Sequence, residues 1–307
     1  MNESLTQDAD HKSGFVNIIG NPNVGKSTLM NVLVGERMSI ITHKPQTTRH
    51  RILGIVNDAQ HQIIFSDSPG IIEDPQYEMQ GAMNSFAFSS TEDADILLFM
   101  SDTLEDPYEG DERIINRMKK LSYPIFLLIN KIDVNDKADD IERTWQSFGF
   151  KDLRVFKISA KEKTGIEPLL AEIKSLLPNH PPFYPKDQLT DKPERFFISE
   201  MIREQILLQF KQEIPYSTEV VVTEFKESEK HGAPFVHMRA EIYVMRKTQK
   251  SIIIGKGGSS IKQLGIGSRK VIEAFLGKRI HLELYVRVKE NWRDDKRYLK
   301  NFGYLKS

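Results

Sequence analysis

FVNIIGNPNVGKSTLM, residues 15–30, joins an apolar strand to a helix through a glycine-rich turn. The turn, Gly20–Ser27, fits the pattern G-x-x-x-x-G-K-[ST]. Its glycines let backbone N–H groups curl around phosphate oxygens, with the positive end of the following helix behind them. A chance glycine-rich turn is the alternative, but it would need neither the strand before it nor the helix after it. The stretch therefore predicts a P-loop that binds a nucleotide phosphate.

Most residues of this turn have an expected place beside the nucleotide. The ammonium of Lys26 is predicted to reach the β- and γ-phosphates, and the hydroxyl of Ser27 to ligate Mg²⁺. We expect the nucleotide contacts of this segment to come from Gly20, Asn21, Pro22, Asn23, Val24, Gly25, Lys26, Ser27 and Thr28.

Short apolar runs alternate with amphipathic segments from Phe15 to about Leu177. Nearly continuous apolar runs are typical of strands covered on both faces, and strand–helix alternation predicts a mostly parallel sheet with right-handed crossovers. The runs His50–Val56 and Gln62–Ser66 predict a hairpin that adds an antiparallel edge. The predicted fold class is therefore α/β, with a mostly parallel six-stranded sheet. Its expected parallel strands are 15–19, 62–66, 95–100, 124–130 and 154–159, and two of the expected helices are 27–34 and 110–121.

Two segments after the P-loop are predicted to complete the phosphate site. Asp67 closes the strand 62–66, where a carboxylate can hold Mg²⁺ through water, and the N–H of Gly70 can sense the γ-phosphate. Alone, D-x-x-G better fits an ordinary Asp-initiated turn, but its place downstream of a phosphate loop favours the Mg²⁺ site. A threonine between the first helix and the hairpin can complete the Mg²⁺ coordination, and we choose Thr48 over Thr47. The expected contacts are Asp67, Ser68, Pro69, Gly70 and Ile71, and the expected catalytic groups are Lys26, Thr48 and Gly70.

The base site is predicted at the end of strand 124–130. The carboxylate of Asp133 offers two acceptors, which match the N1–H and 2-amino donors of guanine and are left unpaired by adenine. Asn130 can bond the base and tie loops together, and the N–H of Ala160 can donate to the guanine O6. Alone, N-K-x-D is a common surface turn, but its place on the same sheet favours GTP or GDP over ATP. The expected contacts are Asn130, Lys131, Ile132, Asp133, Ser159, Ala160 and Lys161.

The pattern changes after Pro178–Pro182, which cannot continue a helix. The following elements predict a second, α+β domain. In order, they are a helix at 194–211, strands at 218–227 and 235–246, a glycine turn at 255–258, a helix to about 276 and a strand at 280–288.

Gly255–Gly258, with the sequence GKGG, is the candidate RNA site. Glycines let the backbone approach a nucleic-acid strand with no Cβ in the way. Alone, GKGG better fits a flexible helix–helix turn, but the run Ile252–Ile254 before it, the basic charge around it and the flanking strands favour RNA. Base contacts are expected in an apolar groove beside this loop, with no residue assigned. The expected RNA contacts are Gly255, Lys256, Gly257, Gly258, Lys262, Arg269 and Lys270; packing is expected for most of Trp292, Tyr298, Phe302 and Tyr304.

Composition narrows the class of protein. The net charge of the 307 residues is zero, but residues 181–307 carry +8 and residues 239–307 carry +11. A basic C-terminal part is typical of a nucleic-acid partner or an anionic surface. The chain has no cysteine, which excludes disulfides and thiolate metal sites, and no apolar run approaches the ~18 residues of a membrane span. We expect a cytoplasmic protein and a monomer.

The segments above resemble the translation-factor class of GTPases over about residues 15–177. PNVGKS at 22–27, QTTRHR at 46–51 and DSPGI at 67–71 narrow the resemblance to the Era family, as does IIIGKGG at 252–258. The resemblance implies a GTPase domain followed by a type II KH domain. It divides the chain into a disordered tail (1–12), a GTPase domain (13–178), a linker (179–193) and a KH domain with a basic tail (194–307).

The resemblance also implies activity and partners. It implies Mg²⁺-dependent hydrolysis of GTP, binding to the 3′ region of small-subunit (16S) ribosomal RNA, and a role in rRNA processing and maturation of the 30S subunit. In related GTPases an Asn at the place of Asn23 helps to hold K⁺ against the phosphates; the alternative is that Asn23 only braces the loop. The basic half leaves open a weak peripheral association with the inner membrane, although no strong amphipathic signature favours it.

One residue departs from the pattern in a way that affects the expected chemistry. Ile71 stands where Ras-like enzymes carry the Gln that orients the attacking water, so no side chain is assigned to that step. An RNA-binding factor that uses GTP only as a structural ligand therefore stays as an alternative. Ser68 replaces the usual Thr of D-T-P-G, and we expect little effect from it.

Overall fold

The computed structural model describes residues 11–42, 44, 46–70, 72, 74–89, 93–104, 112–230 and 232–305, with only the backbone for 112–114. The chain forms two compact units, which are described separately. The first contains residues 1–39, 48–73 and 83–191, and the second contains residues 40–47, 74–82 and 192–307. Two short segments from the N-terminal half thus belong to the second unit.

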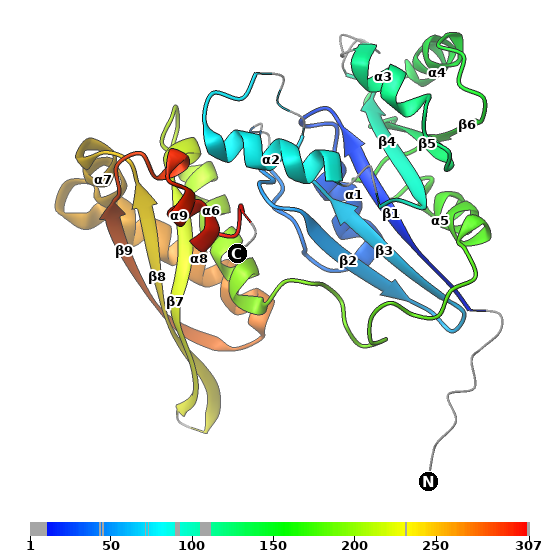
Figure 1. The fold of residues 1–307 in the computed structure, drawn as a ribbon. Helices are drawn as coiled ribbons and strands as arrows, with labels where there is room; N and C mark the ends of the chain where they lie inside the picture. Colours follow the sequence, from blue (N-terminus) through cyan, green and yellow to red (C-terminus); the bar gives the residue numbers. More distant parts are fainter. Residues whose placement is uncertain are drawn as a thin grey trace. The chain divides into compact units, whose positions relative to one another are not determined.

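A six-stranded sheet forms the centre of the first unit (Figure 1). All neighbouring strands are parallel except the first pair, β2 and β3, which are antiparallel. The predicted α/β architecture with its antiparallel edge is therefore confirmed. In sheet order the strands are β2 (Ile52–Asn57), β3 (His61–Asp67), β1 (Lys12–Gly20), β4 (Ile96–Asp102), β5 (Ile125–Asn130) and β6 (Leu153–Lys157).

The sheet's central strands are buried on both faces, which explains their uninterrupted apolar runs. Side chains such as Ile18, Leu98 and Phe126 are fully buried. One face carries a cluster in which Phe99 packs on Trp145, with ring centroids 4.7 Å apart. The helices in this half of the chain are α1 (Lys26–Val34), α2 (Glu78–Ser89), α3 (Glu112–Met118), α4 (Ala138–Ser147) and α5 (Ile166–Leu176).

Two predicted elements end earlier than expected. The helix predicted over 110–121 ends at Met118, because Lys120 and Leu121 bond the carbonyls three residues before them and tighten the last turn. The strand predicted over 154–159 ends at Lys157, because Ser159 instead pairs with Thr164 in a tight turn. Residues 110 and 111 lie outside the described part of the chain.

The segment after α5 lies along the edge strand of the first unit. The Ile55 N–H donates to the carbonyl of Leu189, and the Leu53 N–H donates to the carboxylate of Asp191. Gln62 accepts hydrogen bonds from the N–H groups of Phe183 and Tyr184 through its side-chain oxygen. The expected linker, 179–193, is thus bonded to β2 and β3 for most of its length, and it covers an edge that would otherwise expose unpaired backbone groups.

The second unit contains a three-stranded sheet with helices packed on it. β7 (Glu219–Lys230) and β8 (Ala233–Val244) form an antiparallel hairpin, and β9 (Arg279–Val288) pairs with β8 in parallel. The order helix, two strands, helix, glycine turn, helix and strand agrees with the predicted α+β domain. Its helices are α6 (Glu194–Gln209), α7 (Lys247–Ile254), α8 (Ser259–Leu276) and α9 (Lys296–Asn301).

The aromatic residues of the C-terminal tail pack as expected. Trp292 and Tyr304 are buried, with the Trp292 indole N–H donating to the carbonyl of Ser217 and the Tyr304 hydroxyl to Glu219. Phe302 lies against Trp292, with ring centroids 5.4 Å apart. These three side chains therefore stabilise the second unit, and their rings are used for packing rather than for stacking on bases.

Candidate functional site

The predicted P-loop follows β1 and begins α1 at the carboxyl end of the sheet. Gly25 has a φ of 106°, and a Cβ there would lie 2.4 Å from Nδ2 of Asn130. Glycine is thus required both by the backbone and by the close approach of Asn130, in the segment predicted to bind guanine. The Lys26 ammonium donates to the carbonyls of Gly20 and Asn21, at 2.9 and 2.7 Å, which holds it over the loop.

Three oxygen-bearing side chains meet beside this loop. The Ser27 hydroxyl donates to Oδ2 of Asp67 at 2.9 Å and lies 3.1 Å from the hydroxyl of Thr48. Burial raises the pKa of Asp67, and the charge of Lys26 opposes that effect. Oδ1 of Asp67 is buried without a hydrogen-bond partner among the described residues. Hard oxygen ligands and an unsatisfied carboxylate oxygen fit a Mg²⁺ ion.

The neighbouring Thr47 has other partners. Its hydroxyl donates to the carbonyl of Lys44 at 2.6 Å and lies 3.2 Å from the hydroxyl of Thr42. Its carbonyl accepts from the guanidinium of Arg203 at 2.6 Å, within the second unit. The structure therefore brings Thr48, and not Thr47, to Ser27 and Asp67.

Asn130 connects the segments of the base corner. Its Nδ2 donates to the carbonyl of Val24 at 2.8 Å, and its Oδ1 accepts from the Ala160 N–H at 2.9 Å. The N–H expected to donate to guanine is thus used within the protein here. Asp133 is exposed, and a hydrogen bond from Ser159 at 2.6 Å lowers the pKa of its carboxyl. A carboxylate that stays ionised is the acceptor that guanine requires.

The other residues predicted for this site have varied surroundings. Lys131 forms an ion pair with the buried Asp102 on β4. Ser68 is buried, with its hydroxyl 3.5 Å from the carbonyl of Ile18. Arg49, the arginine that follows Thr48 in the chain, is also buried. The predicted contact Ile71 lies outside the described residues. Asn21, Pro22 and Asn23 are exposed in the loop, Thr28 lies on α1, Pro69 and Gly70 follow β3, and Ile132 and Lys161 lie in the turns after β5 and β6.

The predicted RNA loop lies between α7 and α8. Gly257 and Gly258 have φ values of 59° and 80°, and a Cβ on either would point into open space. Lys256 is exposed beside them. A ligand backbone can therefore approach this turn closely, with the N-terminus of α8 behind it.

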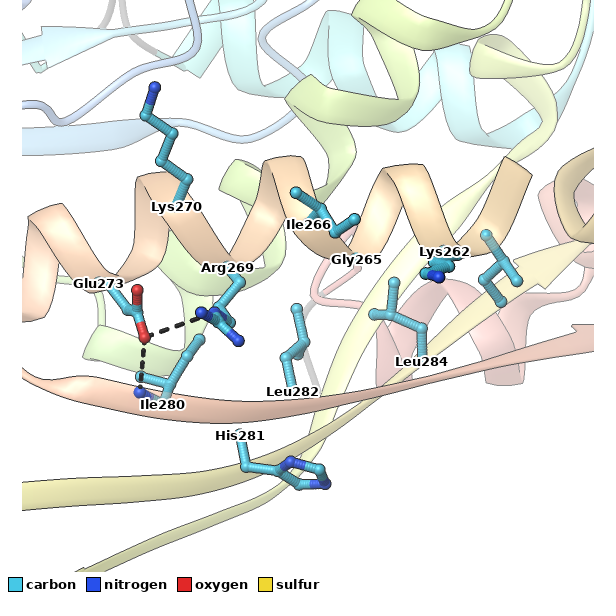
Figure 2. Close-up of a pocket in the computed structure, with 11 residues that line it drawn as sticks. Lys262, Gly265, Ile266, Arg269, Lys270, Glu273, Ile280, His281, Leu282 and Leu284 are labelled. Atoms are coloured by element: carbon cyan, nitrogen blue, oxygen red, sulfur yellow. Dashed lines mark hydrogen bonds and ion pairs between the residues drawn. The ribbon is translucent and has the colours of Figure 1, made fainter. Parts of the chain in front are cut away.

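A groove lies between α8 and β9, and its lining begins at Ile261, three residues after this loop (Figure 2). Its volume is about 670 Å³. Figure 2 shows Ile280, Leu282 and Leu284 pointing from β9 toward α8, where Ile266 is 63% exposed. The exposed cations Lys262, Arg269 and Lys270 also line it, with Arg269 3.5 Å from the carboxylate of Glu273. An apolar floor with basic sides suits unstacked bases on a charged backbone.

The apolar residues of this groove were not assigned from the sequence. The signal was available in the alternation of RIHLELYVRV, residues 279–288, which places Ile280, Leu282 and Leu284 on one face. Which face met α8 could not be read from the alternation alone.

The nucleotide and groove regions both match known families. Residues 15–131 match the family described as 50S ribosome-binding GTPase, and residues 213–293 match the KH domain. GTPase Era of Lactobacillus helveticus is 44% identical over 309 residues, which cover 98% of each chain. This chain belongs to the Era family. The predicted family, the GTPase activity and the C-terminal KH domain are thereby confirmed.

Solved structures of Era relatives have the same fold. An Era variant of Aquifex aeolicus bound to GDP and aluminium fluoride is 37% identical, with a TM-score of 0.87 over 95% of this chain and 99% of that one. Another Era structure, bound to MgGDPNP and nucleotides 1506–1542 of 16S ribosomal RNA, is 36% identical, with a TM-score of 0.88 over 96% and 99% of the chains. No helix in the described part of this Era-family chain is long and apolar enough to cross a membrane.

Proposed function

We propose that this chain binds GTP with Mg²⁺ on its first unit, hydrolyses it, and binds the 3′ region of 16S ribosomal RNA in the groove of its second unit. The grouping of Ser27, Thr48 and Asp67, together with the unsatisfied Oδ1 of Asp67, supports the metal and phosphate assignment. The RNA assignment is supported by the open glycine turn, by the basic apolar groove, and by the relative that binds this part of the rRNA. Through that binding the protein would act in rRNA processing and in maturation of the 30S subunit.

The proposed nucleotide contacts are those predicted from the five segments. Backbone N–H groups of Gly20–Ser27 bind the phosphates, and Lys26 exchanges its two carbonyl partners for phosphate oxygens. Asp133 accepts the two guanine donors, while Asn130 fixes the distance between the base corner and the P-loop. When bound, Mg²⁺ supplies Lewis-acid stabilisation of the phosphate oxygens. Ser27 and Thr48 would hold it directly, and Asp67 through water.

Catalysis would rest on positioning and electrostatic stabilisation rather than on a general base. Lys26 places a positive charge where negative charge develops on the γ-phosphate oxygens. The N–H of Gly70 contacts the γ-phosphate. When the γ-phosphate leaves after hydrolysis, this contact is lost and the segment that contains Gly70 is released. No cis arginine is proposed for this step, because Arg49 is buried.

We also propose that Asn23 helps to hold a K⁺ ion beside the phosphates. The residue is exposed, and its φ of 65° is a conformation that Asn tolerates. Among the described residues its side-chain amide makes no hydrogen bond that would brace the loop. Its carbonyl oxygen thus has the freedom that a cation ligand needs.

The proposal extends to the organisation of the protein. We propose a tail at 1–12, of which the last residue, Lys12, already begins β1, a GTPase domain at 13–178, a linker at 179–193 and a KH domain from 194, acting as a monomer in the cytoplasm. The alternative to a purely cytoplasmic location is weak peripheral association of the basic half with the inner membrane. A vesicle-flotation assay with anionic lipids, at physiological salt, separates the two.

The base-site assignment is tested by the substitution Asp133→Asn. The side-chain amide of Asn presents a donor where guanine also has a donor, so GTP binding should weaken by on the order of 2–4 kcal/mol. Xanthine offers an acceptor at this position, so the variant should prefer xanthosine nucleotides. Isothermal titration with GDP and with xanthosine diphosphate measures both. Unchanged affinity for GDP would remove Asp133 from the site.

The RNA assignment is tested separately with an RNA fragment. The wild-type chain should bind a fragment of the 16S rRNA 3′ end more tightly than a scrambled fragment of equal length, in an electrophoretic mobility-shift assay. Equal binding of the two would leave only a non-specific affinity for RNA.

A further inference from the structure

Three metal-ligating side chains meet on the sheet of the second unit. His237 lies on β8, and His281 and Glu283 lie on β9. The parallel register pairs His237 with His281, and Glu283 shares the face of His281 because side chains alternate along a strand. Figure 2 shows His281 pointing away from α8, on the opposite side of β9 from Leu282. The His281 ring therefore lies on the other face of β9 from the apolar floor, although His281 is also one of the residues that line the groove.

The spacing of the ligand atoms is close to that of a tetrahedral metal site. Oε1 of Glu283 lies 3.5 Å from Nε2 of His237 and 3.6 Å from Nε2 of His281. Ligands bonded to Zn²⁺ at ~2.0–2.1 Å with tetrahedral angles stand roughly 3.3–3.4 Å apart. The ligand atoms of all three residues lie within 4.8 Å of one another. The two distances from Glu283 to the histidines are thus close to the required length. Rotation of the half-exposed His281 ring can shorten the third distance, between the imidazole nitrogens of His237 and His281.

The second carboxylate oxygen of Glu283 is already held in place. Oε2 accepts from Nη2 of Arg239 at 3.2 Å and from the hydroxyl of Tyr285 at 3.1 Å. These bonds leave Oε1 directed at the two imidazoles, as the partners of a metal-bound carboxylate do. The positive charge of Arg239 opposes a cation, but its side chain is 42% exposed and is screened by water.

We propose that His237, His281 and Glu283 form a binding site for Zn²⁺. Two imidazole nitrogens and one carboxylate oxygen suit this ion, whereas Mg²⁺ requires near-octahedral oxygen ligands. The partial exposure of the three side chains gives the ion an entry path and leaves the fourth position to water. A bound ion would join β8 to β9, the strand whose other face lines the groove.

The experiment is isothermal titration of ZnCl₂ into the full chain saturated with Mg²⁺ and GDP, so that the nucleotide site is occupied. We expect one Zn²⁺ per chain, and at least tenfold weaker binding for His237→Ala and for His281→Ala. His61→Ala is the matched control, because His61 lies in the first unit beside Asp58 and should leave the affinity unchanged. Titration with CaCl₂ should give no binding.

A second variant separates loss of a ligand from loss of structure. Glu283→Gln keeps the shape of the side chain and its bond to Tyr285 while removing the charge, and it should also weaken Zn²⁺ binding at least tenfold. Circular dichroism and thermal unfolding without Zn²⁺ should match the wild type for each variant. The proposal is overturned if the wild type shows no saturable Zn²⁺ site, or if all three variants bind Zn²⁺ as tightly as the wild type.

Discussion

Thr47 and Thr48 are adjacent in the chain, yet their hydroxyls have different partners. Thr48 lies with Ser27, whereas Thr47 bonds the carbonyl of Lys44. Thr48→Ala should therefore weaken Mg²⁺-dependent GTP binding and hydrolysis, on the order of tenfold or more, because a bond to a charged partner is worth ~1.5–3 kcal/mol. Thr47→Ala keeps the backbone carbonyl of residue 47, so GTP binding and hydrolysis by this variant should stay within about twofold of the wild type. Steady-state phosphate release over a range of MgCl₂ concentrations measures both, and a larger loss in Thr47→Ala would reverse the assignment.

The exposed Asn23 leads to a prediction on cation dependence. Hydrolysis by the wild type should be faster in KCl than in NaCl at equal ionic strength, and Asn23→Ala should lose the difference. A charge stabiliser at this position is worth up to ~10³–10⁵ in rate when it is an arginine, so even a partial effect is measurable. Phosphate release in the two salts is the measurement, and equal wild-type rates would reject the cation site.

At the scale of single residues, the sequence predicted the types and order of the side chains but not all of their bonds. Lys26 follows β1, and Asp67 and Asn130 are the last residues of β3 and β5, so their meeting at one edge of the sheet follows from the topology. The bond from the Ala160 N–H to Asn130 was not predicted, because it depends on how two loops settle against each other. Motif spacing carries no information about such a contact.

The glycine turn between α7 and α8 is the element on which RNA binding is expected to depend. Replacing both Lys256 and Gly257 by Asp places two carboxylates where a phosphate is expected and adds a Cβ at the open position. The φ of 59° at Gly257 is one that Asp tolerates, so the fold should be retained. RNA affinity should fall at least tenfold while intrinsic GTP hydrolysis is unchanged. A filter-binding assay for RNA and an assay of phosphate release test this prediction. If the variant keeps the RNA affinity of the wild type, the loop is only a structural turn and does not bind RNA.

The accuracy of the predicted elements followed the strength of their patterns. β4 and β5 are continuous apolar runs and were located within a residue or two of their observed bounds. The pairing of residues 183–191 with β2 and β3 was not predicted, because a polar, proline-containing segment shows no strand pattern and is held by side-chain bonds to Gln62 and Asp191. Edge pairing of this kind depends on partners more than 120 residues away in sequence.

For the whole molecule, the least predictable feature is the unit to which each segment belongs. Residues 40–47 lie in the N-terminal half but are held by α6 in the second unit. Lys44 donates to the carbonyls of Leu207 and Phe210 at the end of that helix, and Arg203 donates to the carbonyl of Thr47. A lysine at a helix C-terminus also interacts favourably with the helix dipole. Nothing local in the sequence pairs Lys44 with a helix more than 160 residues away.

This attachment predicts coupling between nucleotide and RNA. The residue after Thr47 is Thr48, the proposed Mg²⁺ ligand, so ordering of Thr48 by GTP acts on a segment that is bonded to α6. Coupling energies of this kind are typically ~1–3 kcal/mol, or 5–150-fold in affinity, and they are reciprocal. RNA affinity of the wild type should therefore differ between a non-hydrolysable GTP analogue and GDP by a factor in this range.

Lys44→Ala removes the bonds to α6 without altering the base site or the groove. In this variant the ratio of RNA affinities with the GTP analogue and with GDP should approach one, while GDP affinity measured without RNA stays as in the wild type. Lys211→Ala is the matched control, because it removes a second lysine near the same helix end and leaves the bonds of Lys44 in place. Fluorescence anisotropy of a labelled RNA fragment, at constant salt, gives both affinities. If Lys44→Ala keeps the wild-type ratio, nucleotide state reaches the RNA groove by some route other than residues 40–47.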